Sequence, residues 1–191
     1  MEEIDLVRSL RNGDEGAYRL IVDQYQTLVL NCCFRFVRNR EIAEDLTQEV
    51  FIEVHRSIKS FKLLSSFSTW LYRIAITKSL DHIKSLKRKK RFGFLKSIYS
   101  DDEHEEVVLT STLPNPQQML ENEERIKVLS WAIESLPENQ KVAFTLSKYD
   151  ELSYQEIADI LDTTIPSIES LIFRAKFNLK KKLYQFYNEH L

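Results

Sequence analysis

Aromatic and basic side chains are interleaved between residues 61 and 91. The rings and the first cations among them are Phe61, Phe67, Trp70, Tyr72, Arg73, Lys78 and Lys84. Nucleobases stack on aromatic rings while phosphates attract lysine and arginine, so binding of single-stranded nucleic acid is the chemistry expected here. A plain structural interpretation competes, because Phe67 and Trp70 are also typical core residues. The basic run 87–91 alone could be a solvated helix end that the helix dipole favours.

A second pattern lies near the C-terminus, where a short helix over 154–161 and a turn over 162–164 precede a longer helix that begins around Pro166. This order is typical of a helix-turn-helix, whose second helix enters the major groove of duplex DNA. The residues expected to form its small core are Ile157, Ala158, Leu161, Ile165, Ile168 and Ile172. The outward candidates for phosphate and base-edge contacts are Thr164, Ser167, Glu169, Ser170, Phe173, Arg174 and Lys176. A helical hairpin that binds nothing is the alternative.

A third pattern is the amphipathic segment 41–58. Apolar residues recur every four positions, at Ile42, Leu46, Val50, Val54 and Ile58, which predicts one buried helix face. The other face carries Glu41, Glu44, Asp45, Gln48, Glu49 and Glu53. Such a face is either an ordinary solvated surface or a docking face for a basic partner.

These patterns need helices to position them, and the sequence predicts an all-α fold. Strand signals are nearly absent, and only 3 Gly and 4 Pro interrupt the chain. Helices are expected at about 3–11, 14–38, 41–58 and 66–90. Helices are expected again from about residue 115 onward, with a capping box at Ser153 and Glu156. We predict two small helical domains, 1–91 and 121–191, joined by a flexible linker at 92–120.

The net charge of −2 conceals local basic surfaces. Residues 1–91 hold 17 Lys and Arg against 12 Asp and Glu, whereas residues 92–120 hold 1 against 5. Basic residues cluster at 84–91 and again at 174–182. Phosphates meet local surfaces, so an acidic total does not exclude nucleic acid as a partner.

Several classes of protein are disfavoured. The chain has no phosphate-binding glycine loop, no HExxH and no metal-type cysteine spacing, so no enzyme site, metal or cofactor is expected. Cys32 and Cys33 are adjacent and are expected to be small buried residues. No stretch has the length and apolarity of a membrane span or signal peptide, which favours a cytoplasmic protein without membrane insertion.

The ordered blocks AEDLTQEVF, SSFSTWLYRIAITKSLDHIK, SLPENQKVAF and SYQEIADIL…SIESLIFRAK resemble the bacterial sigma-70 family. The lack of further blocks between the two units is similar to the extracytoplasmic-function (ECF) subfamily. The likeness spans nearly the whole chain except the linker. It implies a sigma factor that joins core RNA polymerase and directs initiation at specific promoters, and that is commonly held inactive by an anti-sigma protein.

The resemblance also implies roles for residues. Polymerase contact, against the β′ clamp coiled coil, would fall to Asp45, Leu46, Gln48, Glu49 and Phe51. Melting and capture of the −10 element would fall to Phe67, Trp70, Arg73, Thr77, Lys78, Asp81, Lys84, Lys87 and Arg88. Residues 165–176 would enter the −35 duplex, and the C-terminal unit would also touch the β flap.

The chain departs from the family pattern at three positions. Thr77 stands where many relatives carry Asn, and Glu169 and Leu171 stand where many carry basic residues. We therefore expect one −10 base to be read differently or less stringently, and the −35 element to be read more by its shape and by phosphate contacts. A stand-alone helix-turn-helix regulator, whose N-terminal helices dimerise or sense a ligand, is the competing hypothesis. An enzyme with a helical binding domain is a remote third.

Overall fold

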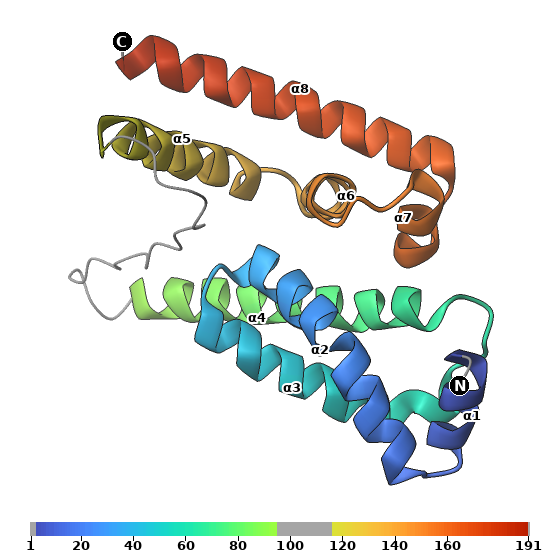
Figure 1. Ribbon diagram of the computed structural model, residues 1–191. Coiled ribbons are helices and arrows are strands. Elements are labelled where there is room, and N and C mark those ends of the chain that lie inside the picture. Colours follow the sequence, from blue (N-terminus) through green and yellow to red (C-terminus); the bar gives the residue numbers. More distant parts are fainter. Residues whose placement is uncertain (1–2, 95–115, 191) are drawn as a thin grey trace. The chain divides into compact units, whose positions relative to one another are not determined.

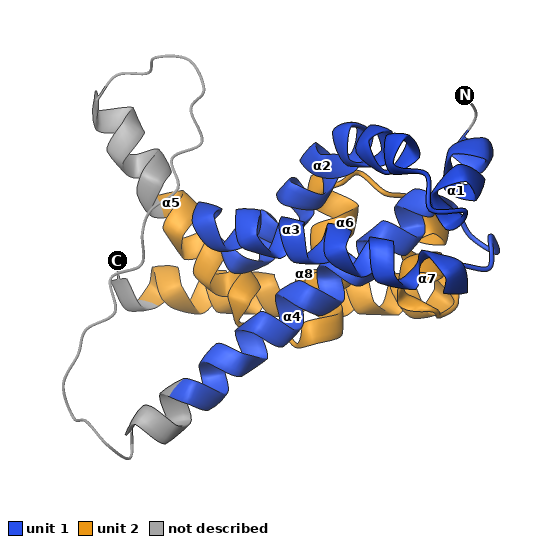
Figure 2. Cartoon of the chain, turned by 90° about the horizontal axis from the view of Figure 1, so that it is seen from below, with its two compact units in different colours: residues 1–105 blue, residues 106–191 orange. Residues whose placement is uncertain are grey.

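The computed structural model describes residues 3–94 and 116–190, and the chain divides into two compact units between residues 105 and 106 (Figure 2). Every regular element in the described ranges is a helix, which confirms the all-α prediction. Among these residues, none of the helices combines the length and apolarity that crossing a membrane requires.

The first unit is a bundle of three main helices with a short helix at its end (Figure 1). Its elements are α1 (Glu3–Arg11), α2 (Glu15–Val37), α3 (Arg40–Ser57), the 3-10 turn η1 (Ile58–Ser60) and α4 (Phe67–Phe94). Helix α2 packs against both α3 and α4, α3 packs against α4, and α1 packs on α2. The three long helices therefore enclose one core, and α3 and α4 each keep one face outside it.

Local side chains explain where these helices begin. Gly13 has φ of 85°, a value that favours glycine, and it ends the turn after α1. Asp14 then caps α2, because its carboxylate accepts hydrogen bonds from the amides of Gly16 at 2.8 Å and Ala17 at 3.1 Å. Asn39 caps α3 in the same way, by accepting from the Ile42 amide at 2.9 Å. These caps place the start of α2 where the sequence predicts it.

The second unit is built along one long helix. Its elements are α5 (Pro116–Glu134), α6 (Glu138–Tyr149), α7 (Tyr154–Leu161) and α8 (Ile165–His190). Helix α8 packs against each of the other three, and α6 also packs against α7. Part of its core is formed by Ala132, Ile133, Leu136, Ala175 and Leu179. Because α8 continues well past α7, it contributes both to the helix-turn-helix and to the packing against α5.

The range 92–120 was predicted to be a linker, but helix occupies both of its ends. Helix α4 continues through Phe94 and α5 begins at Pro116. Gly93, Pro114 and Pro116 interrupt the helical pattern in and beside these short end segments. The predicted linker therefore begins before, and ends after, the segment that separates α4 from α5. The rest of the predicted linker, including the acidic cluster 101–106, lies outside the described residues.

The predicted cores need small corrections. Ile165 is 37% exposed rather than buried, because it is the first residue of α8 and has no preceding helical turn to cover it. Helical spacing also predicts one apolar stripe at Ile126, Leu129, Ile133 and Leu136. Ile126 and Leu129 are 38% and 39% exposed, so only the later part of this stripe, Ile133 and Leu136, enters the core. By contrast, Cys32 and Cys33 are fully buried, as predicted.

Candidate nucleic-acid and polymerase interfaces

Helix α3 separates the five residues expected to contact polymerase into two groups. Asp45, Gln48 and Glu49 are exposed on its outer face. Leu46 and Phe51 are only 3% and 5% exposed, so their side chains lie in the core and do not face a partner. This follows from the apolar period, which places them on the inner face. The face formed by Asp45, Gln48 and Glu49 is therefore polar and acidic, and the buried residues of α3 hold it in place.

Helix α4 carries the residues expected at the −10 element along its length. Those that follow one another at spacings of three or four residues, and therefore share one helix face, are Trp70, Arg73, Thr77, Asp81, Lys84 and Arg88. Trp70 and Arg73 are partly buried, and the other four are exposed. The hydroxyl of Thr77 donates to the Arg73 carbonyl at 2.7 Å. Lys87 is also exposed, whereas Lys78 lies to the side and faces α3.

An aromatic cluster supports the start of this face. Phe61 stacks on Trp70 with ring centroids 4.9 Å apart, and Phe67 packs against both rings at 5.9 and 5.6 Å. Phe67 is 1% exposed, so it belongs to the core and cannot stack on a base. Trp70 keeps part of its surface free. The sequence left both rings open between a core role and a stacking role. The structure places Phe67 in the core and leaves Trp70 partly exposed.

The helix-turn-helix of the second unit forms as the sequence predicts. Ser153 and Glu156 make a reciprocal capping box: the Ser153 amide donates to Glu156 Oε2 at 2.8 Å, and the Glu156 amide donates to Ser153 Oγ at 3.3 Å. The Ser153 hydroxyl also donates to Glu156 Oε2 at 2.7 Å. This hydrogen bond first, and then the one from the Ser153 amide, lowers the pKa of the Glu156 carboxyl below its ordinary value. Asp162 ends α7 with φ of 51°, and the Thr163 amide donates to the Ala158 carbonyl at 3.0 Å. Helix α7 is therefore hydrogen-bonded at both of its ends.

Helix α8 presents the residues expected at the −35 element on the side away from the core. Ile168, Ile172 and Ala175 are buried, and Ala175 belongs to the core cluster that includes Ala132 and Ile133 of α5. The exposed members of the expected set are Thr164, Glu169, Phe173, Arg174 and Lys176, and the partly buried ones are Ser167 and Ser170. Phe173 is 72% exposed, the largest exposure among the apolar residues of α8. The whole set therefore lies on or beside one accessible surface of α8.

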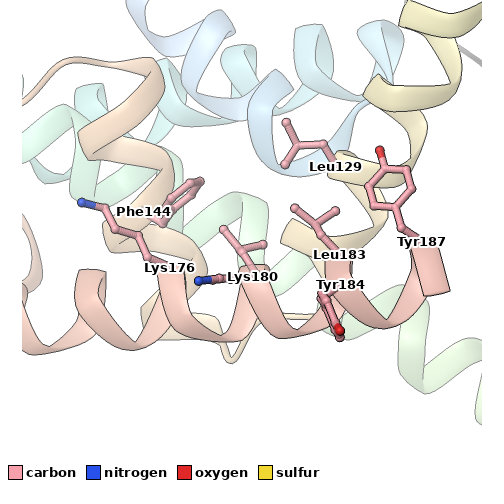
Figure 3. Close-up of a pocket in the computed structure, with 8 residues that line it drawn as sticks. Leu129, Phe144, Lys176, Lys180, Leu183, Tyr184 and Tyr187 are labelled. Atoms are coloured by element: carbon pink, nitrogen blue, oxygen red, sulfur yellow. The ribbon is translucent and has the colours of Figure 1, made fainter.

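A groove of about 480 Å³ lies within the second unit, between α8 and the helices α5 and α6 (Figure 3). Leu129, Leu183 and Tyr187 line one end, and Phe144 and Lys176 line the other. Its lining is mostly apolar, with the side chains of Lys176, Lys180, Tyr184 and Tyr187 among the residues that line it. Across residues 3–94 and 116–190, no group of three or more His, Cys, Asp or Glu side chains is placed to hold a metal ion.

Comparisons with known proteins agree with this arrangement. The family model for Sigma-70 region 2 matches residues 21–89, and the model for Sigma-70 region 4 matches residues 128–179. The chain is 34% identical to the ECF RNA polymerase sigma-E factor of Escherichia coli (strain K12), over 93% of this chain and 92% of that protein. It is 33% identical to the sigma-E factor of Haemophilus influenzae, over 93% of each chain.

The chain belongs to the ECF subfamily of sigma-70 factors. Its function is that of a promoter-directing subunit, and the stand-alone regulator is not favoured. Two solved structures share the fold. One is CnrH in complex with the cytosolic domain of CnrY, with a TM-score of 0.64 and 18% identity over 96% of this chain and 97% of CnrH. The other is the sigma factor RpoE in complex with the anti-sigma factor NepR from Bartonella quintana, with a TM-score of 0.62 and 19% identity over 87% and 96% of the chains.

In this ECF sigma factor, the region 2 match begins inside α2 and leaves α1 outside. Residues that sequence reasoning missed lie at the edges of the matched regions. Glu3 on α1 contacts the start of α4, a long-range hydrogen bond that no local pattern reveals. Phe177 and Tyr184 are 62% and 70% exposed on α8. Phe177 follows Phe173 by four residues and Tyr184 follows Phe177 by seven, a spacing that could have marked the three rings as one outer stripe.

Proposed function

We propose that the first unit binds core RNA polymerase through the exposed face of α3 and captures the −10 element on α4, while the second unit reads the −35 duplex with α8. The observation that carries this proposal is the face of α4, where the partly exposed ring of Trp70 precedes polar and charged side chains, three of them cationic and one, Asp81, acidic. A ring that stacks on a base beside cations that meet phosphates suits an opened strand.

The polymerase contact rests on charge. Asp45, Gln48 and Glu49 offer two carboxylates and an amide on a helix whose buried side is fixed in the core. Such a surface complements a basic partner, which for this family we place on the β′ clamp coiled coil. Leu46 and Phe51 contribute indirectly, because their burial in the core fixes the position of the acidic face of α3.

The duplex contact rests on the exposed part of α8. Arg174 and Lys176 supply charge for phosphates, while Ser167 and Ser170 supply hydroxyls for phosphates or base edges. Glu169 places a carboxylate on the same surface, where relatives commonly have a cation. We infer that the −35 element is read largely by shape and phosphate contacts, and that the second unit also touches the β flap.

Further partners and the compartment belong to the same proposal. CnrH and RpoE were each solved with a bound protein, which for RpoE is named as an anti-sigma factor. We infer that an anti-sigma protein holds this chain too. The chain acts where polymerase and DNA are, in the cytoplasm. It performs no catalysis itself, since phosphodiester bond formation belongs to the polymerase.

The test is run-off transcription with purified chain, purified core polymerase and a genomic promoter library. We expect transcripts from a defined set of start sites that require both the chain and core polymerase. Mapping those starts also identifies the promoter sequence. If the chain neither joins core polymerase nor starts transcription from any fragment, the proposal is wrong.

A further inference from the structure

The carboxylate of Glu3 joins three helices of the first unit. Its Oε1 accepts a hydrogen bond from the Phe67 amide at 2.9 Å, and its Oε2 accepts one from the Tyr25 hydroxyl at 2.9 Å. Glu3 lies on α1, Tyr25 on α2 and Phe67 at the first position of α4. One side chain thus connects the N-terminal helix to the start of the helix proposed to capture the −10 strand.

This contact satisfies a backbone group that the helix leaves free. The first amides of any α-helix have no partner within the helix, and a carboxylate near them also complements the helix dipole. Ser66 already accepts a hydrogen bond from the Thr69 amide at 3.1 Å, and Glu3 takes the Phe67 amide. The start of α4 is therefore capped twice, once locally and once from a helix 64 residues away in sequence.

The loop before α4 depends on the same contact. Phe61, at the start of the loop, is buried and stacks on Trp70. Leu63 has φ of 58°, a left-handed conformation that costs a leucine energy, and Leu64 is 88% exposed. Phe67, at the end of the loop, packs edge-on against Tyr25 with ring centroids 5.4 Å apart. Holding the Phe67 amide thus fixes one end of a strained loop that displays Leu64.

Helix α1 is itself held firmly enough to serve as an anchor. Its residues Leu6, Val7 and Leu10 are 5%, 1% and 3% exposed. Arg11 donates from Nη2 to the Lys59 carbonyl in η1 at 3.4 Å, on the other side of the loop. Because the family match begins at residue 21, α1 and Glu3 lie outside the part of the chain that the match describes.

We propose that Glu3 is a positioning residue for −10 capture: by fixing the Phe67 amide it sets the start of α4, the loop 61–66 and the exposed edge of Trp70. This inference rests on the proposed role of α4. Glu3 acts through its neighbours and not on the DNA, because both carboxylate oxygens are engaged and an anion would repel phosphates.

The experiment uses the full chain reconstituted with core polymerase on a promoter found by start-site mapping. It compares the wild type with Glu3→Ala, Glu3→Gln and Asp5→Ala. The amide of Gln can accept from the Phe67 amide and donate to the Tyr25 hydroxyl oxygen, so Glu3→Gln keeps both contacts without the charge. Asp5 is an exposed acid on the same helix that pairs only with its neighbour Arg8, at 3.8 Å, among the contacts described for it, and it serves as the control.

The first readout is the opening of the −10 element, which the fluorescence of a base analogue in the DNA reports. The second is the ratio of opening between the mapped −10 sequence and single-base variants of it. The third is assembly with core polymerase. For Glu3→Ala we expect opening to fall about tenfold, the sequence ratio to shrink and assembly to stay unchanged. Glu3→Gln should retain most of the opening and the ratio, and Asp5→Ala should match the wild type.

Three results would overturn the inference. The first is wild-type opening and sequence ratio in Glu3→Ala. The second is an equal loss in Glu3→Gln and Glu3→Ala, which would assign the effect to charge. The third is a loss of opening in Glu3→Ala that is the same for every −10 sequence and that disappears below the melting temperature of the variant protein. That result would show that Glu3 only stabilises the fold. Failure of the wild type to open any promoter would instead overturn the proposed function.

Discussion

Lys78 Nζ lies 3.7 Å from Glu49 Oε2, so a residue expected at the −10 strand faces a residue expected at polymerase. Glu53 Oε2 is also within 3.8 Å of the same ammonium group. The three side chains link α4 to α3 across one edge of the first unit. An ion pair with this much exposure contributes about 0.2–1 kcal/mol to stability. Its larger consequence is that a substitution of Glu49 also removes one of the two ion-pair partners of Lys78.

Asp45 therefore offers the cleaner test of the polymerase contact. It is exposed on the same face of α3, and no ion pair is described for it. We expect Asp45→Lys to weaken binding to core polymerase by about tenfold or more, because a repulsive pair replaces an attractive one at the interface. Fluorescence anisotropy of the labelled chain against core polymerase measures this, and the melting temperature should change little.

Asp23→Lys is the matched control, since it reverses the same charge at an exposed position on α2. It should leave polymerase affinity unchanged. Glu49→Lys should weaken binding too, with an added small loss of stability from repulsion with Lys78. Equal affinities for wild type, Asp45→Lys and Asp23→Lys would remove α3 from the interface.

The first unit shows which features a sequence can reveal. Four-residue spacing placed the buried face of α3, and Asp14 placed the start of α2, because both signals act within one or two turns of helix. The family resemblance assigned Leu46 and Phe51 to polymerase contact, whereas the structure buries both side chains in the core. The contacts of Glu3 with Phe67 and of Lys78 with Glu49 could not be predicted, since they depend on how helices distant in sequence pack together.

Arg174 on α8 provides the test of duplex binding. It is exposed beside Phe173 on the helix proposed to enter the −35 element. We expect Arg174→Ala to weaken binding to −35 duplex by roughly 1–3 kcal/mol, whichever sequence is offered, and to reduce the salt dependence of binding by about one counterion. Titrations of the duplex at several salt concentrations measure both quantities.

Lys148 on α6 is the control, because it is an exposed cation of the same unit that lies outside the helix-turn-helix. Lys148→Ala should retain the affinity and the salt slope of the wild type. A loss in Arg174→Ala that is confined to one base pair would assign Arg174 to base reading. Unchanged affinity and slope would exclude it from the interface.

In the second unit, the capping box and the turn were predictable because all their partners lie within a few residues. The exposure of Ile165 was not, since apolar type and spacing place it in the core while its position at the helix start leaves it uncovered. The groove lined by Leu129 and Tyr187 also escaped prediction, because it forms only where α5 and α8 lie together.

The capping box itself yields a stability prediction. Ser153→Ala removes the acceptor for the Glu156 amide and should lower the free energy of unfolding of the second unit by about 1 kcal/mol. Ser147→Ala, in the interior of α6, should cost nothing comparable because alanine favours helix. Urea denaturation followed by circular dichroism measures both variants, and equal losses would contradict a specific cap.

This prediction has a pH dependence with a definite sign. Because the folded-state pKa of Glu156 is lowered, its contribution to stability is present above the unfolded pKa of about 4.3 and is lost as pH falls through the folded value. The difference between the wild type and Ser153→Ala should therefore narrow in acid. A difference that stays constant from pH 7 to pH 3 would show that the charge of Glu156 contributes nothing to the cap.

The buried cysteines give a last test, of the core of the first unit. Burial raises the pKa of the Cys32 thiol above its ordinary value, and the neighbouring thiol of Cys33 adds to the shift. Burial also raises the pKa of Cys33, although hydrogen bonds with Ser79 and Thr47 partly offset it. Thiolate is the reactive form, so both thiols should be nearly inert to a disulfide reagent in the folded chain. Both should react after denaturation.

The same shifts make alkaline conditions destabilising. A raised folded-state pKa gives a contribution that is complete below the unfolded value of about 8.5 and is lost as pH rises toward the folded value, because only the unfolded chain releases these protons. The melting temperature should fall above about pH 8.5. Cys32→Ala/Cys33→Ala starts from a lower melting temperature, since it loses packing, but it should fall less steeply over that range. Parallel slopes, or rapid labelling of the folded wild type, would contradict the buried placement of these two side chains between α2 and its neighbours.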